Sequence, residues 1–113
     1  MRILQYLHFT SNTFPIRYEY EIDKKDYEFE FNYNSVGDFI TVLVRDSEGK
    51  ILFSTKLVYG VPLNHFVVDG FPSNVKLIPL DLDDLYRDEF VEISVNRDTL
   101  GSTVQIYIIE KTV

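Results

Sequence analysis

Residues 26–33 read Asp-Tyr-Glu-Phe-Glu-Phe-Asn-Tyr, so aromatic and polar residues alternate along the whole stretch. Successive side chains of a β-strand point to opposite faces, and this alternation therefore predicts a strand with one buried and one solvent-facing side. Residues 17–22 alternate in the same way, with aromatic and apolar residues opposed by charged ones. Only Asp23-Lys24-Lys25 separates the two runs, which favours an antiparallel hairpin.

Further segments have the β-branched and apolar composition of strands and are separated by turn residues. We predict these strands at residues 1–7, 39–44, 51–58, 75–80, 90–95 and 103–109. The segment 39–44 is apolar on both faces, which is typical of a central strand. In the polar loop 46–50, Gly49 can adopt a positive φ and so suits a second hairpin. Residues 60–72 are expected to form a structured loop, and the acidic segment 81–88 has room for one helical turn.

Short, regularly spaced strands without a convincing amphipathic helix predict an all-β protein, either an antiparallel β-sandwich or a small barrel-like fold. The 113 residues, of which 45% are hydrophobic, suit a single domain over residues 1–113. Free sheet edges, where another chain could pair, are expected at residues 1–7 or 103–113. The expected core includes Tyr27, Phe29, Phe31, Leu43, Phe53, Leu57, Ile106 and Ile108.

The charge balance limits the classes of partner. Eleven basic and eighteen acidic residues give a net charge of −7, which repels a phosphate backbone, so we expect no nucleic-acid partner. No apolar run approaches the roughly 20 residues of a membrane span, and residues 1–8 are too short and polar for a signal peptide. Because the chain has no cysteine, a reducing cytoplasm is the expected site of synthesis.

Two groups of polar residues are candidates for metal or catalytic chemistry. His8 and His65 lack a nearby carboxylate at metal-ligand spacing, so we interpret both as structural or surface groups. Asp81, Asp83 and Asp84 lie in the densest acidic cluster and could hold calcium, but the regular spacing of a calcium loop is missing. A solvated loop is the preferred interpretation, and we predict no metal and no cofactor.

The predicted hairpin places Glu19, Glu21, Glu28 and Glu30 on its polar face, near one another if the strands pair in a simple register. A solvated outer face is the first interpretation, a docking surface for a basic partner is the second, and a glycosidase acid and base pair is the third. The eight tyrosines could stack on sugar rings, but most alternate with charged residues and are expected at the core. We predict no enzyme activity.

The order of these features is similar to that of a known family. The matching features are the aromatic hairpin, the strand 39–44 with the turn 46–50, the strand 51–58, the step Gly60-Val61-Pro62-Leu63 and the closing element 96–107. Over residues 14–109 the chain resembles the baseplate plug proteins of contractile-tailed phages and prophages. The acidic segment 81–89 is an insertion or local variation in this comparison.

The resemblance implies a structural virion component of the tail baseplate that helps to close the central hub and tail channel. It implies contacts with other baseplate proteins (hub, spike or wedge), room for a homo-oligomer, and synthesis and assembly in the bacterial host cytoplasm. It implies no catalytic or cofactor residues. The alternatives are a carbohydrate-binding β-sandwich that uses exposed tyrosines and, third, a glycan hydrolase. The expected docking surface comprises Glu19, Glu21, Glu28, Glu30, Asp81, Asp83 and Asp84.

Overall fold

The computed structural model describes residues 2–9, 13–81 and 94–110, and within these residues the chain forms strands, turns and loops but no helix. The predicted all-β class is therefore confirmed. The predicted strand 90–95 falls mostly outside the described residues. Asp83 and Asp84 also lie outside them. In chain order the strands are β1 (Arg2–Tyr6), β2 (Ile16–Ile22), β3 (Lys25–Asn34), β4 (Phe39–Asp46), β5 (Ile51–Lys56), β6 (Val75–Leu80) and β7 (Gln105–Glu110).

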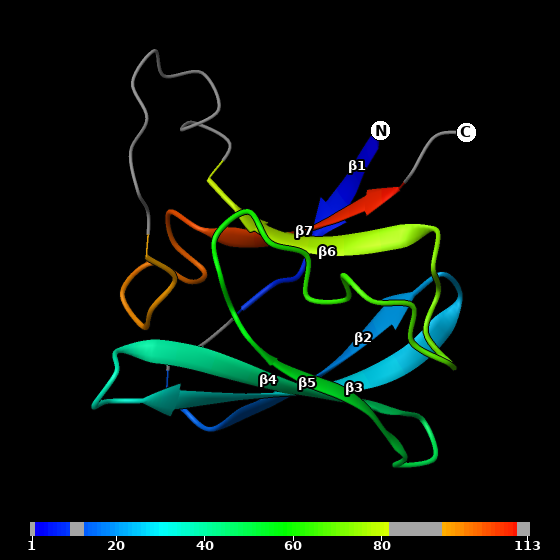
Figure 1. Cartoon of the computed structure of the whole chain (residues 1–113), viewed down its shortest axis with the longest axis horizontal. Helices are drawn as coiled ribbons and strands as arrows, with labels where there is room; N and C mark the ends of the chain where they lie inside the picture. Colours follow the sequence, from blue (N-terminus) through cyan, green and yellow to red (C-terminus); the bar gives the residue numbers. More distant parts are fainter. Residues whose placement is uncertain (1, 10–12, 82–93, 111–113) are drawn as a thin grey trace.

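The strands form two antiparallel sheets that face each other as the layers of a sandwich (Figure 1). One sheet has the order β2-β3-β4-β5, so each strand pairs with its neighbour in sequence, and β4 is central as expected. The other has the order β1-β7-β6. β1 lies at an edge, as predicted, but the prediction of an edge at residues 103–113 is wrong because β7 pairs on both sides.

The β2–β3 hairpin forms as the alternation predicts. Its turn is tighter than expected, because β3 already begins at Lys25 and only Asp23 and Lys24 connect the strands, with φ values of 52° and 70°. Positive φ at both central residues matches the right-handed twist of the flanking strands. The register pairs Tyr18 with Phe29 and Tyr20 with Tyr27 on the side that faces the other sheet.

The core lies between the sheets and is built from the inward side of each strand. Phe29 and Phe31 of β3 have no exposed surface, and their rings stack with centroids 6.2 Å apart. Of the predicted core, Tyr27, Leu57, Ile106 and Ile108 are also buried, and Phe53 packs partly buried against it. The prediction that Leu43 belongs to the core is wrong, because this residue pairs with Glu30 and points to the outer side of its sheet.

The connection from β5 to β6 closes one side of the sandwich, and its green trace crosses in front of the gap between the layers in Figure 1. Its buried residues Leu63 and Phe71 join the core, which confirms a structured loop. The loop also covers the outer edge of β6: Gly60 N donates to Pro79 O, and Leu63 N donates to Leu77 O. Such cover protects an edge strand from pairing with other chains.

Candidate functional site

The outer side of the β2–β3 hairpin carries the four glutamates that the sequence singles out. We call Glu19, Glu21, Glu28 and Glu30 the acid face. Glu19 lies directly opposite Glu28, as expected from a simple register, whereas Glu21 lies opposite Asp26 and Glu30 opposite Arg17. The strand alternation that buries the aromatic residues on one side therefore presents these charges on the other.

Two arginines neutralise half of the acid face. Arg17 Nε lies 2.9 Å from Glu30 Oε1, and an Arg45 guanidinium nitrogen lies 3.0 Å from Glu28 Oε1 and 3.3 Å from Glu30 Oε1. Asn32 Nδ2 donates to the other oxygen of Glu30 at 3.2 Å. These hydrogen bonds, first from Asn32 and then from Arg45, lower the pKa of the Glu30 carboxyl because they favour its charged form.

Glu19 and Glu21, in contrast to Glu28 and Glu30, are not paired with any of the described arginines. Both are exposed, and neither forms an ion pair with any residue that the structure describes. Beside Glu19 lies an open cavity of about 480 Å³, to which Asp26 from the start of β3 and Glu48 from the turn after β4 contribute. Negative charge therefore concentrates at the end of the sheet where the start of β3 lies near the turn after β4.

The hydrogen bonds that Glu30 accepts from Asn32 and Arg45 lead to a prediction about acid stability. Because the folded pKa of Glu30 lies below its unfolded value, its contribution is complete above about pH 4.3 and is lost as the pH falls through the folded pKa. Glu30→Gln should therefore destabilise the protein at pH 7 by less than about 1 kcal/mol, with the difference shrinking towards pH 3. Urea unfolding of both proteins at several pH values measures this difference.

Glu21→Gln is the control, because the exposed Glu21 has no ion pair within the described chain, and its loss should change the free energy of unfolding at pH 7 by less than about 0.5 kcal/mol. A constant difference between wild type and Glu30→Gln from pH 7 to pH 3 would contradict the role assigned to the hydrogen bonds of Asn32 and Arg45 with this carboxylate.

Of the remaining predicted docking residues, Asp81 belongs to a different part of the molecule. Asp81 directly follows β6 in the three-stranded sheet, where its backbone N–H donates to the Tyr59 hydroxyl at 3.2 Å. It therefore does not lie on the acid face. Asp83 and Asp84 are outside the described residues, so docking by these aspartates stays a prediction.

The arrangement does not favour acid and base catalysis on the acid face. A glycosidase acid needs a raised pKa, whereas the pKa of Glu30 is lowered and Glu28 is paired with a cation. His8 lies beside Tyr6 with tilted rings whose centroids are 4.6 Å apart, and His65 lies beside Phe66 with ring centroids 3.9 Å apart. Among the residues described, no three His, Asp or Glu side chains come together in a way that could hold a metal ion.

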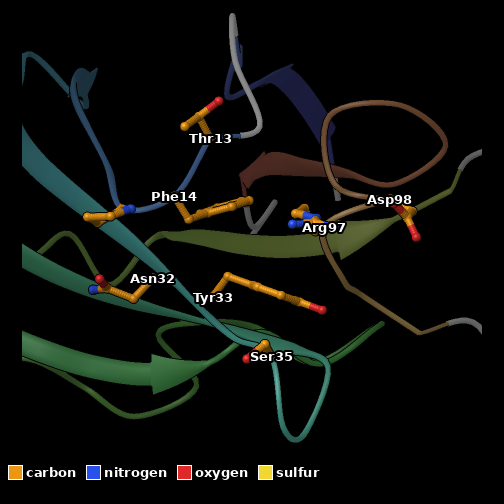
Figure 2. A pocket seen from close by; sticks show the side chains of 8 residues that line it. Thr13, Phe14, Asn32, Tyr33, Ser35, Arg97 and Asp98 are labelled. Atoms are coloured by element: carbon orange, nitrogen blue, oxygen red, sulfur yellow. The ribbon is translucent and has the colours of Figure 1, made fainter.

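A second surface feature, which the sequence analysis missed, is a pocket of about 520 Å³ at one end of the sandwich (Figure 2). The connection before β2 contributes Phe14, the end of β3 contributes Asn32 and Tyr33, and the loop before β7 contributes Arg97. The rings of Phe14 and Tyr33 have centroids 6.1 Å apart, and the Arg97 guanidinium carbon lies 5.2 Å from the Tyr33 centroid. We call this site the Arg97 pocket.

The tyrosines give limited support to a sugar-binding surface. Tyr27 is buried, and four others, Tyr18, Tyr20, Tyr33 and Tyr59, pack against the core. Most of the described tyrosine surface therefore supports the core, as the alternation with charged residues predicts. None of the described residues forms a helix that could cross a membrane.

Comparison with known proteins gives one family. The family described as "Cyanophage baseplate Pam3 plug gp18" matches residues 4–111, which is nearly the whole chain. No curated protein and no solved structure matches the chain. The match confirms the resemblance drawn from the aromatic hairpin, the turn 46–50 and the closing element 96–107. With all seven described strands inside or overlapping the matched range, the chain belongs to this family of phage baseplate plug proteins.

Proposed function

We propose that this structural protein of the phage baseplate closes the central hub channel of the tail and does so through surface contacts alone, without catalysis. The family match over residues 4–111 carries the proposal. A sandwich whose inward side chains pack into a core suits such a part, because its outer faces and edges remain for neighbours. The carbohydrate-binding alternative receives no support from this family.

The acid face is the proposed docking surface, and a more basic hub, spike or wedge protein is the proposed partner. Glu28 and Glu30 are already paired with arginines, so the charge offered to a partner comes mainly from Glu19 and Glu21. Complementary charge steers encounter and fixes orientation more than it adds affinity. Assembly then takes place in the host cytoplasm, with room for more than one copy of this chain in each baseplate.

Reversing the exposed charges should slow assembly. Glu19→Lys and Glu21→Lys together are expected to lower the association rate with plug-free baseplates by roughly tenfold or more at low salt, with a smaller effect at high salt. The free energy of unfolding should change by less than about 0.5 kcal/mol, because both side chains are exposed. Surface-immobilised baseplates from a phage lacking this gene allow the rate to be measured.

Asp69→Lys is the matched control for each single reversal, because Asp69 is exposed and belongs to the β5–β6 connection rather than to the β2–β3 hairpin that carries the acid face. Its association rate should stay close to that of wild type. Equal effects of Asp69→Lys and Glu21→Lys would show that only net charge matters and would exclude the acid face as the docking surface. If deleting the gene left contractile tails complete and infectious, the plug function itself would be excluded.

A further inference from the structure

The Arg97 pocket is held in shape by contacts between distant parts of the chain. The Tyr33 hydroxyl donates to Asp38 Oδ1 at 2.6 Å, and Asn96 Nδ2 donates to Asp38 Oδ2 at 3.3 Å. Asp38 thus ties the turn after β3 to the loop that carries Arg97. The same loop is braced internally, because Asn96 Oδ1 accepts from the backbone N–H of Asp98 at 3.0 Å. A pocket that is already ordered loses less entropy when a ligand binds.

The charges around the pocket leave one cation available. Arg97 is exposed and forms no ion pair with any other residue in the described part of the chain. Asp98 also lines the pocket, but its carboxylate points away from the Arg97 guanidinium in Figure 2. The carboxylate of Asp38 already accepts bonds from Tyr33 and Asn96. The Arg97 guanidinium, which lies over the Tyr33 ring, therefore has N–H donors available for an acceptor on a ligand.

The surroundings of this cation narrow the chemistry of its ligand. A guanidinium presents paired N–H donors that match the two oxygens of a carboxylate. The rings of Phe14 and Tyr33 offer apolar surface next to it, and Asn32 adds an amide at the opposite side of the pocket (Figure 2). A ligand that combines one carboxylate with adjoining apolar atoms fits this arrangement. Nucleic acid does not, because the chain has a net charge of −7.

We propose that the Arg97 pocket binds an aspartate or glutamate side chain on an extended segment of a partner protein. The acidic side chain pairs with Arg97, and an apolar neighbour in the same segment packs on Phe14 and Tyr33. This site is lined by other residues than the acid face, although its Asn32 donates to Glu30, and it presents a guanidinium rather than carboxylates to a partner. It gives the plug a second type of contact, for an acidic rather than a basic surface, and its failure would leave the acid face unaffected.

The test uses the full chain labelled with ¹⁵N and short peptides as probes in NMR titrations. The probes are acetyl-Leu-Glu-Leu-amide, the same peptide with Gln in place of Glu, and the Gln peptide with a free terminal carboxylate. We expect the Glu peptide to shift the signals of Tyr33, Ser35 and Arg97. Its affinity should exceed that of the Gln peptide at least about tenfold, which corresponds to ~1.4 kcal/mol.

Variants locate the binding to the guanidinium. Arg97→Ala should abolish the preference for Glu over Gln, and Arg97→Lys should retain part of it, because an ammonium keeps the charge but not the paired donors. Lys56→Ala is the matched control: it removes another cation that lies over a ring, 4.6 Å from the Phe39 centroid, and should leave the preference unchanged.

Four outcomes would overturn the proposal. These are equal affinity for the Glu and Gln peptides, signal shifts confined to residues outside the pocket, no shift with any peptide at millimolar concentration, and an unchanged preference in Arg97→Ala. A fifth such outcome is tighter binding of the Gln peptide with a free carboxylate than of the Glu peptide, because the preferred ligand would then be a chain terminus instead of a side chain. The ¹⁵N spectrum itself verifies that each variant is folded.

Discussion

Phe31→Ala is expected to lower the free energy of unfolding by about 3 to 5 kcal/mol, the usual cost of removing a fully buried ring and leaving a cavity. Phe31 has no exposed surface, and its ring meets Phe29 and the ring of Phe9, whose centroid is 5.0 Å away. The free energy of unfolding of a protein of this size is typically only about 5 to 15 kcal/mol, so the substitution would remove a large part of it. Urea unfolding measures the loss as a lower midpoint with an unchanged slope.

Phe66→Ala is the control for this substitution, because it removes the same ring from an exposed position in the β5–β6 connection. With 70% of its surface exposed, Phe66 should contribute within about 0.5 kcal/mol of zero. If Phe31→Ala cost no more than Phe66→Ala, the inward orientation of β3, and with it the assignment of the sandwich core, would be wrong.

The second large effect is expected at Asn64, the one polar residue buried among those described. Its Nδ2 donates to Val75 O at 2.8 Å, and its Oδ1 accepts from Leu77 N at 3.1 Å. Asn64→Ala would leave both buried backbone groups of β6 without partners, at a cost of about 1 to 3 kcal/mol for each. We expect a total loss of about 2 to 4 kcal/mol, accompanied by faster hydrogen exchange at the Leu77 amide.

Asn74→Ala provides the comparison, since Asn74 is exposed just before β6 and forms no hydrogen bond with another described side chain. Its effect should stay within about 0.5 kcal/mol. Full protection of the Leu77 amide in Asn64→Ala would contradict the proposed role, because it would mean that water or another group replaces the lost acceptor.

The parts of the fold that depend only on residues close together in the sequence could be predicted. The alternation around Phe29 identifies both the strand and its buried side, because strand periodicity is a local property. The same reasoning fails in β4, where apolar residues occupy both sides. Nothing in residues 39–44 distinguishes the inward Val42 from the outward Leu43, since the choice depends on the opposing sheet.

The features that the sequence analysis missed all depend on contacts between distant residues. The central position of β7 results from pairing with β1 and β6, and no local pattern encodes this order. The neutralisation of Glu30 depends on the register of three strands, which brings Arg17 and Arg45 to the same carboxylate. The acid face could be predicted as a set of positions, but its remaining charge could not. The Arg97 pocket likewise needs two loops to meet.

The central position of β7 also determines the order in which the protein can fold during synthesis. A ribosome releases β2 to β5 early, so this meander can pair while the remainder of the chain is still being made. β1 and β6 must wait for β7, the last of the described strands, before either has a sheet partner. The nascent chain is therefore most exposed to aggregation shortly before β7 emerges, and a premature stop ahead of Gln105 would leave β1 and β6 unpaired.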